Sequence, residues 1–532
     1  MPHPCVQLPS SPCMPDGLTQ RLKHAFARRF NTATWQADVA VPPHTTNGDE
    51  ERYHDKCGTY TKCIKQANPG KVDLGAYKLF RHALNSGHYG DFEAVPLGGT
   101  RTLNGPMGSY AYMLCGSDSS QFGDAPSPDN PETHHVVPPA LALASPAYST
   151  ELIELYWASL LRDVAFTEYP QSQIAQDAAA ELSNGADYEG PKHHGKVTPE
   201  ILFRGKFHGE TAGPYTSQFL LTPTALGALP IEQRYITYRA RIDYMTDLAT
   251  WSNVQNGIST GLQNQNDPTL RYLYNGRGLA AWTHVDVLFQ AYFTAFLVLQ
   301  SIGAPLNPGV PYISSKIQNG FGTFGPPDFA ATVGAVAKIA LNEVWYQKWP
   351  IHLRHRPESG GGLVQLIQDG VTFDGSPDVS VFNSAALQQS HQKYGGYLLS
   401  QAFPEGSPAH PAYPTGHGTV AGACITILKF FFDGKFVLSN PQVPSADGTV
   451  LEPWSGSDSL TVNGELHKLA HNISFGHGIH AGIHWRSDTD VSIQLGEAVA
   501  LSVLRDMACT YAEPFTVEIT KLDGKPATIS NQ

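Results

Sequence analysis

The segment 283–300 places apolar side chains around most of the circumference of a predicted helix. A helix that is apolar on nearly all sides has no face suited to water, so it is expected at the centre of a larger helical body. Helical spacing of apolar residues recurs in 145–164, 170–185, 228–252 and 327–348, and after Gly416 and Ser487. Strand signals are limited to 459–462 and a C-terminal hairpin that turns at Asp523-Gly524. The pattern predicts a mainly α-helical protein with a small β appendage.

Residues 1–140 differ from the rest of the 532-residue chain, because they are rich in Pro, Gly, Asn and His and contain few periodic segments. The sequence therefore predicts two parts. Residues 1–140 form an irregular N-terminal arm that wraps a neighbour or the main body, and residues 141–532 form one large helical domain. Ser145 and Pro146 fit the cap and the first position of the helix that opens this domain.

The charge balance excludes some broad function classes. With 35 Lys and Arg against 47 Asp and Glu, the formal net charge is −12, which argues against a general nucleic-acid or anionic-membrane binder. The most apolar run, 285–299, is too short to span a bilayer and contains Asp286. A soluble chain without membrane spans is expected. The N-terminus shows no standard secretory signal peptide, and localisation is left open.

The seven cysteines lack the spacing of a zinc site, so incidental thiols are favoured over metal ligands, although Cys57 and Cys63 could form a bridge.

Three segments in the last two hundred residues carry basic residues that apolar periodicity does not explain. They are KWPIHLRHRPE from Lys348, HPAYPTGHGTVAG from His410 and FGHGIHAGIHWRSD from Phe475. Each has an ordinary explanation when taken alone: a solvated helix end, a helix cap, and structural histidines or a zinc pair at His480 and His484. The combination of all three in one chain favours a common site.

Together the segments have the chemistry of an oxyanion site. Thr415 and the amide of Gly416 stand at a helix start, where free N–H groups bind anions. Lys348 and Arg356 add full charges, and the Arg fork suits a tetrahedral oxyanion. His484 and His417 lie in the right segments to serve as ligand or nucleophile and as acid–base.

The order Lys-x7-Arg-Pro, Pro-Thr-Gly-His and His-x3-Asp resembles the vanadium-dependent haloperoxidases, which share this signature with phosphatidic-acid phosphatases and class A bacterial acid phosphatases. The resemblance to the algal and cyanobacterial bromoperoxidase branch extends over roughly residues 60–530. It includes AFPEGSPAHPAYPTGH, NGFGTFGPPD and the closing FTVEITKLDG. This resemblance implies a large helical-bundle domain of the haloperoxidase and acid phosphatase type.

Carried onto this chain, the resemblance implies that His484 coordinates the vanadium of a vanadate(V) cofactor. It implies that His417 is the acid–base, and that His410 matches a second active-site histidine of bromoperoxidases. Lys348 would also polarise the peroxide. The groups that would hold the vanadate oxygens are Lys348, Arg356, Thr415 and the amide of Gly416.

Two positions depart from the family pattern. Thr415 stands where the family usually has Ser, a minor change because both hydroxyls donate. The family also expects an Arg six residues before the ligand histidine, where this chain has Gly478. Aligned from Asn472, the Arg position falls on His477, and the loop before His484 is one residue longer. A titratable His477, with an ordinary pKa of about 6.5, would then replace a permanent cation.

The resemblance implies an enzyme that oxidises bromide or iodide with hydrogen peroxide to hypohalous acid, which halogenates a small organic acceptor. It also implies a homo-oligomer, either a dimer or a larger assembly. Two alternatives are a soluble phosphatase that forms a phosphohistidine at His484, and a weakly active structural homologue that lacks one vanadate-binding Arg.

Overall fold

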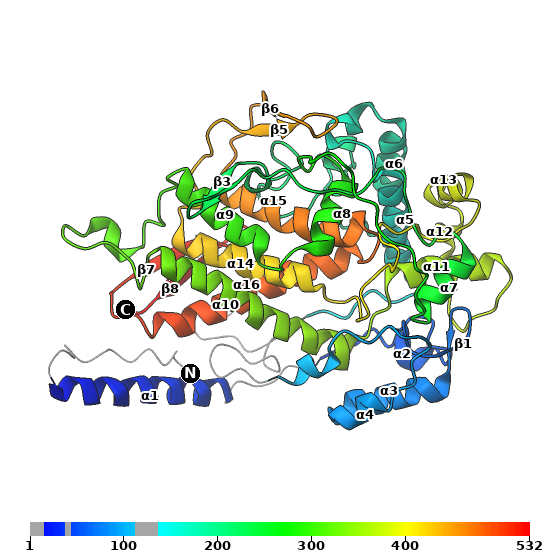
Figure 1. The fold of residues 1–532 in the computed structure, drawn as a ribbon, viewed down its shortest axis with the longest axis horizontal. Coiled ribbons are helices and arrows are strands. Elements are labelled where there is room, and N and C mark those ends of the chain that lie inside the picture. The colour runs from blue at the N-terminus through cyan, green and yellow to red at the C-terminus, as the bar shows by residue number, and fades with distance from the viewer. Residues whose placement is uncertain (1–14, 38–43, 112–136) are drawn as a thin grey trace.

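The computed structural model describes residues 15–37, 44–111 and 137–532. Five helices form the main bundle, and Figure 1 shows α10, α14 and α16 running beside one another through its middle. They are α9 (Gln290–Ser301), α10 (Pro326–Tyr346), α14 (Gly416–Phe431), α15 (Val462–Phe475) and α16 (Arg486–Ala508). The other α-helices are α1 (Pro15–Ala37), α2 (Asp49–Arg52), α3 (Leu74–Ser86), α4 (Tyr89–Glu93), α5 (Pro146–Leu161), α6 (Gln173–Ser183), α7 (Leu248–Gln255), α8 (Gly276–Val285), α11 (Pro357–Gln368), α12 (Val379–Phe382) and α13 (Ala385–Tyr394).

Short elements connect and decorate these helices. The strands form four two-stranded antiparallel hairpins: β1 (Gln66–Asn68) with β2 (Lys71–Val72), β3 (Thr224–Leu226) with β4 (Leu229–Ile231), β5 (Gln442–Pro444) with β6 (Leu451–Pro453), and β7 (Thr516–Thr520) with β8 (Pro526–Ser530). The 3₁₀ turns are η1 (Pro106–Tyr110), η3 (Phe166–Gln171), η4 (Pro199–Ile201), η5 (Gln218–Leu220) and η6 (Pro311–Ser314). Two segments are π-helical: η7 (Gln347–His352) and η8 (Gly476–His480).

Helix α14 is the central helix of the bundle, since every one of its residues is buried. It packs against α16 at very short range because both helices have glycine at the crossing. A Cβ at Gly422 would lie 1.9 Å from the carbonyl oxygen of Ile493, and one at Gly496 would lie 2.1 Å from that of Thr419. This close packing brings the N-terminus of α14 and that of α16 together, and the two ends carry the motif residues.

The expectation of one continuous central helix over 283–300 is wrong. The chain bends by 103° between α8 and α9, and Val285 and Val287 at the bend are 76% and 56% exposed. Asp286 lies at this bend and hydrogen-bonds to His417 of the neighbouring α14. A polar residue in the middle of an apolar run therefore marks the end of a helix that apolar periodicity alone would continue.

Several other sequence predictions are confirmed and two more are wrong. Ser145 caps α5 by accepting from the amide of Tyr148, and the C-terminal hairpin turns at Asp523-Gly524 as predicted. The predicted helix over 228–252 is instead β4 followed by irregular chain up to α7. The predicted strand over 459–462 is the N-terminal cap of α15, where Thr461 accepts from the amide of Gly464. In both places tertiary contacts override local propensity.

The N-terminal part is more regular than the sequence indicates. α1 and α3, of 23 and 13 residues, lie within the segment expected to be irregular, and Figure 1 shows α1 along the lower edge of the molecule. The division of the chain at residue 140 stays a prediction. No single helix in the described residues has the length and apolarity of a membrane span, and only the bent α8–α9 pair reaches them jointly.

Three described cysteines, Cys57, Cys63 and Cys424, are free thiols, and Cys509 is disulfide-bonded. Cys57 and Cys63, which could have formed a bridge, are therefore the free thiols that the sequence favoured. Cys5, Cys13 and Cys115 lie outside the described residues.

Candidate active site

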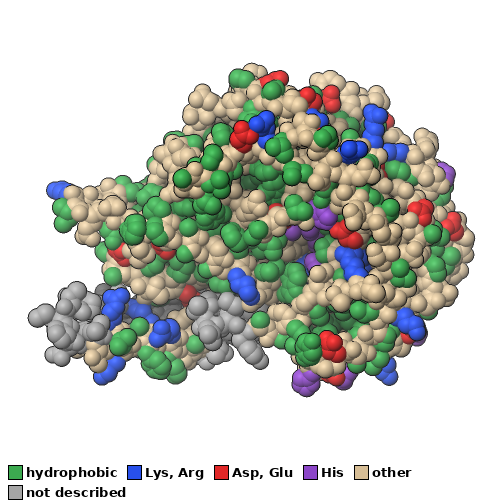
Figure 2. Space-filling model, viewed as in Figure 1, with side chains coloured by type: hydrophobic (Ala, Val, Ile, Leu, Met, Phe, Trp, Pro, Cys, Tyr) green, Lys and Arg blue, Asp and Glu red, His purple; other side chains and the backbone are tan. Residues whose placement is uncertain are grey.

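The three basic segments of the sequence meet at one place in the bundle. Lys348 lies in η7 and Arg356 directly before α11, while Thr415 and His484 precede α14 and α16. These four residues are fully buried, whereas His410, His417 and His477 are each 7–9% exposed. The site therefore has a closed floor and an opening on the side of these three histidines. Figure 2 shows a hollow in this view in which His, Lys and Arg side chains gather beside acidic ones.

His484 is oriented as an imidazole ligand. Its Nδ1 lies 3.0 Å from Asp488 Oδ2, so the carboxylate holds the proton on Nδ1 and leaves the lone pair of Nε2 free to bond. Asp488 is itself fixed by Arg354 at 2.7 Å and by the amide of Trp485 at 3.1 Å. Nε2 of His484 faces the guanidinium of Arg356, at 2.8 Å from Nη1. The free lone pair thus points at the cationic part of the site.

Lys348 and Arg356 form no ion pair among the residues that the structure describes. Lys348 Nζ donates only to the carbonyls of Pro411 and Ala412, at 2.9 and 3.0 Å. Burial, together with the charge of Arg356, holds the pKa of Lys348 well below its ordinary value, and burial lowers the pKa of Arg356 to about 10. Two buried cationic groups without a counter-ion are costly unless an anion neutralises them. The site therefore fits an anion.

Hydrogen-bond donors complete this anion site. The Oγ1 of Thr415 is buried and has no partner among the described groups. Gly416 opens α14, where the first amides of a helix have no intrahelical acceptor and the helix dipole is positive. A tetrahedral oxyanion placed between Lys348, Arg356 and this helix start would receive donors on several sides. The residues present therefore fit the oxyanion cofactor expected from the sequence.

His417 and His477 form a stacked pair at the mouth of the site. Their ring centroids are 3.7 Å apart, and His417 Nε2 lies 3.0 Å from Asp286 Oδ1. A carboxylate at this distance orients the imidazole for proton transfer, as general acid–base catalysis requires. Sequence reasoning missed Asp286 as a site residue. Its one signal was that an acidic residue interrupts the most apolar run of the chain.

The structure places His477 beside His484, whereas His480 and Arg354, two further residues that could supply the missing contact, have other partners. His477 lies 5.6 Å from His484 between ring centroids, and its Nδ1 has no described partner. His480 instead pairs with the hydroxyl of Tyr215 at 2.9 Å, and Arg354 is committed to Asp488. The π-helical turn η8, wider than an α-helical turn, accommodates the additional residue before His484.

The surroundings of His477 disfavour its protonated form. Burial, followed by the positive neighbours His417, His484 and Arg356, holds the pKa of His477 well below its ordinary value. The sequence predicts that His477 is charged at mildly acidic pH. This prediction requires a bound anion that raises the pKa of His477 again.

His410 lies on the other side of the guanidinium of Arg356. Its Nδ1 is 2.9 Å from Nη2, and its ring lies 4.8 Å from that of Trp345. Burial and the charges of Lys348 and Arg356 hold the pKa of His410 well below its ordinary value. A neutral imidazole at this position can accept a hydrogen bond from Arg356 and so hold the guanidinium group in place.

The fold and site define a helical-bundle protein with a buried oxyanion site into which an imidazole is directed. The comparisons with known proteins support the same class of protein. The family model described as the VCPO second helical-bundle domain matches residues 375–512. The chain is 31% identical to the vanadium-dependent bromoperoxidase of Corallina officinalis, over 96% of this chain and 98% of that protein. It is 32% identical to that of Ascophyllum nodosum, over 95% and 92%.

A solved structure agrees with this result. The homohexameric second vanadate-dependent bromoperoxidase of Ascophyllum nodosum superposes with a TM-score of 0.88 at 28% identity, covering 99% of this chain and 92% of that one. The chain belongs to the vanadium-dependent bromoperoxidase family.

Proposed function

We propose that this protein is a vanadium-dependent haloperoxidase, which oxidises bromide or iodide with hydrogen peroxide to hypohalous acid and so halogenates small organic acceptors. The carrying observation is that Asp488 holds the Nδ1 proton of His484, so that Nε2 faces the guanidinium of Arg356, and that neither Arg356 nor Lys348 has an ion-pair partner among the described residues. Vanadium-dependent bromoperoxidases that share about a third of its residues over nearly the whole chain support the same function. No observation favours the phosphatase alternative.

We assign the cofactor-binding roles from the fit described above. His484 Nε2 would bind the vanadium, and Lys348, Arg356, the Thr415 hydroxyl and the Gly416 amide would hold the oxygens, with His477 beside them. Vanadate, when bound, supplies a Lewis-acidic V(V) centre that activates hydrogen peroxide towards halide. Lys348 then holds a positive charge next to the reacting oxygens. His417, oriented by Asp286, accepts a proton from the incoming peroxide and later returns it.

A direct assay tests the function. Purified protein is reconstituted with vanadate, and oxidation of bromide and iodide by hydrogen peroxide is followed with and without the cofactor. Halide oxidation that depends on vanadate is expected. Vanadate binding without halide oxidation would favour the weakly active homologue, and hydrolysis of a phosphate monoester by the vanadate-free protein would favour the phosphatase.

His477→Arg should tighten vanadate binding, because it adds a permanent cation where the present imidazole is neutral. The expected gain is that of a charge-assisted hydrogen bond, roughly 1.5–3 kcal/mol. Vanadate dissociation constants measured by calorimetry at neutral pH test this. His477→Gln is the matched control, since it keeps a neutral donor and should bind within a few-fold of the unchanged protein. Equal affinities for the Arg and Gln variants would place His477 outside the cofactor contacts.

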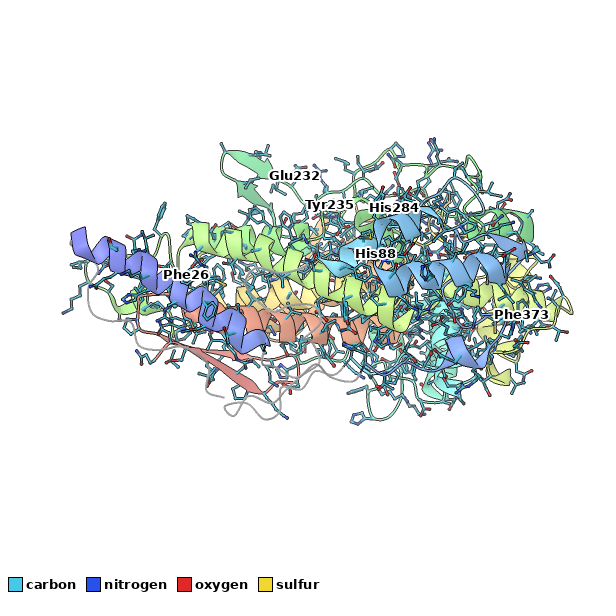
Figure 3. All side chains as sticks on the ribbon, turned by 90° about the horizontal axis from the view of Figure 1, so that it is seen from below. Phe26, His88, Glu232, Tyr235, His284 and Phe373 are labelled. Carbon is cyan, nitrogen blue, oxygen red and sulfur yellow. The ribbon has the colours of Figure 1, made fainter. Side chains whose placement is uncertain are left out.

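We further propose that the protein assembles with copies of itself through α1. Leu22, Phe26 and Phe30 repeat every four residues along this helix and are 67%, 65% and 61% exposed. Figure 3, in which Phe26 is labelled, shows α1 along the face seen from below. α1 carries four Lys or Arg and one Asp, whereas the whole chain has a net charge of −12. A basic helix with an apolar stripe is therefore complementary to the acidic body of a second copy.

The double variant Leu22→Ser/Phe26→Ser should lower the molar mass measured by light scattering after gel filtration. The change removes the apolar stripe from an exposed helix face, so it does not disturb a core. Val379→Ser/Val450→Ser, which replaces residues that are 65% and 53% exposed elsewhere, is the control and should keep the original mass. An unchanged mass for the α1 variant would exclude this helix as the interface.

A further inference from the structure

A pocket of about 240 Å³ lies beside the segments that carry two active-site histidines. One wall is apolar and comes from α7 and the loop after it, with Val254, Ile258 and Leu262. The opposite wall is formed by Arg101, Pro404 and Glu405. Its volume is below the roughly 300–1,000 Å³ of pockets that hold drug-sized ligands, so it suits a smaller molecule.

The pocket is linked to the active site through two short stretches of chain. Glu405 belongs to it and precedes His410 by five residues. The carboxylate of Glu405 also binds His284 Nε2 at 2.6 Å, and His284 precedes Asp286, the partner of His417, by two residues. His410 and His417 are among the few site residues that reach solvent. The pocket is therefore connected, through Glu405 and His284, to the two segments that carry the solvent-reaching imidazoles.

Glu405 presents an ionised carboxylate to the pocket. Burial is the largest single influence and raises its pKa, but the hydrogen bond and charge of His284, a backbone hydrogen bond and the charge of Arg101 together outweigh burial and hold the pKa below its ordinary value. His284 is fixed in turn by the hydroxyl of Tyr238 at Nδ1 and by stacking on Phe403 at 3.9 Å. One carboxylate oxygen is used by His284, and the side chain is still 38% exposed. The second oxygen is therefore available to accept a hydrogen bond from a ligand.

Arg101 shapes the pocket rather than binding an anion in it. Its guanidinium donates to the carbonyls of Glu405 and Ser407, at 2.9 and 3.1 Å. The same two carbonyls accept from Lys62, which pairs with Glu358 in the interior. The 405–407 segment is thus held rigidly, and the pocket offers an apolar wall and one anionic acceptor.

We propose that this pocket binds the organic acceptor as a phenol, with its ring on Val254, Ile258 and Leu262 and its hydroxyl donating to Glu405. The inference rests on the proposed haloperoxidase function. A hydrogen bond to a carboxylate increases the electron density of a phenol ring, which favours electrophilic attack. In the reaction a ring C–H and hypobromous acid give C–Br and water: the O–Br bond breaks, and the ring proton leaves with the hydroxide.

Binding is tested without turnover, so that failure of this proposal and failure of the haloperoxidase function can be distinguished. Fluorine NMR of para-fluorophenol is recorded with the vanadate-loaded protein in the absence of halide and peroxide. Glu405→Gln removes the charge but keeps the shape, and the dissociation constant should rise by about tenfold. Ile258→Ser should also weaken binding, whereas Ile317→Ser, at a 90% exposed isoleucine of a distant loop, should not. Equal binding by all four proteins would overturn the proposal.

Product selectivity gives the second readout. Phenol competes with a non-aromatic alkene acceptor in the presence of bromide, peroxide and the loaded protein, and reagent hypobromous acid provides the reference product ratio. The unchanged protein should give a higher ratio of bromophenol to brominated alkene than reagent hypobromous acid does. Glu405→Gln and Ile258→Ser should lower this ratio towards the reference value. A reference-like ratio for the unchanged protein would mean that the acceptor reacts free in solution, and would overturn the proposal.

Discussion

Replacing His484 with alanine should abolish both vanadate loading and halide oxidation. The lone pair on His484 Nε2 is directed at the guanidinium of Arg356. The orientation of the ring depends on the hydrogen bond from Nδ1 to Asp488. Two of the other imidazoles of the site already have partners of their own. His417 is bound to Asp286, and His410 lies beside Arg356 on the other side of the guanidinium. Vanadate titration followed by vanadium NMR, with the halide assay in parallel, measures both losses.

Two controls separate loss of the ligand from loss of the fold. Excess vanadate should not restore activity to the alanine variant, whereas added imidazole should restore part of it by occupying the space that the side chain leaves. Unfolding of the variant is compared with that of the unchanged protein by circular dichroism. Near-normal halogenation by a folded His484→Ala protein would refute the haloperoxidase assignment.

Replacing His417 with alanine should leave vanadate bound but slow the peroxide step. The imidazole sits at the mouth of the site rather than on the closed floor, and is 9% exposed while Lys348, Arg356, Thr415 and His484 are fully buried. General acid–base catalysis by a positioned side chain contributes roughly 10²–10⁴-fold, which sets the expected loss. Stopped-flow measurement of peroxide consumption by the loaded variant tests this.

Asp286→Asn serves as the graded control for His417. An amide still contacts the imidazole but orients it less firmly than the carboxylate, so the peroxide step should slow less than in His417→Ala, with the same vanadate affinity. If vanadate affinity collapses in His417→Ala while the loaded fraction keeps its normal peroxide kinetics, His417 is a cofactor-binding residue and the acid–base role is wrong.

Much of this protein can be predicted from the sequence because its chemistry is concentrated in short local motifs. Pro-Thr-Gly-His before a helix specifies a helix start with free amides, and its position at the N-terminus of α14 is confirmed. The cap of α5 and the C-terminal hairpin are also confirmed, since capping and turn formation depend on residues a few positions apart. The family relationship follows from the order of the three motifs and is confirmed by the relatives.

What the sequence left open depends on contacts between distant segments. Apolar periodicity predicts one helix over 283–300, yet the chain bends at Asp286, because the carboxylate meets His417, 131 residues away in sequence. Which residue occupies the position of the family Arg could not be decided from spacing, since His480 is close to His477 along the chain and Arg354 comes from a distant segment that also meets the site. Only the packing of η8 against α14 places His477 on His417 and commits the other two elsewhere. The sequence by itself determined the types of group in the site; the tertiary structure decided their partners, because hydrogen bonding and desolvation depend on neighbours far away along the chain.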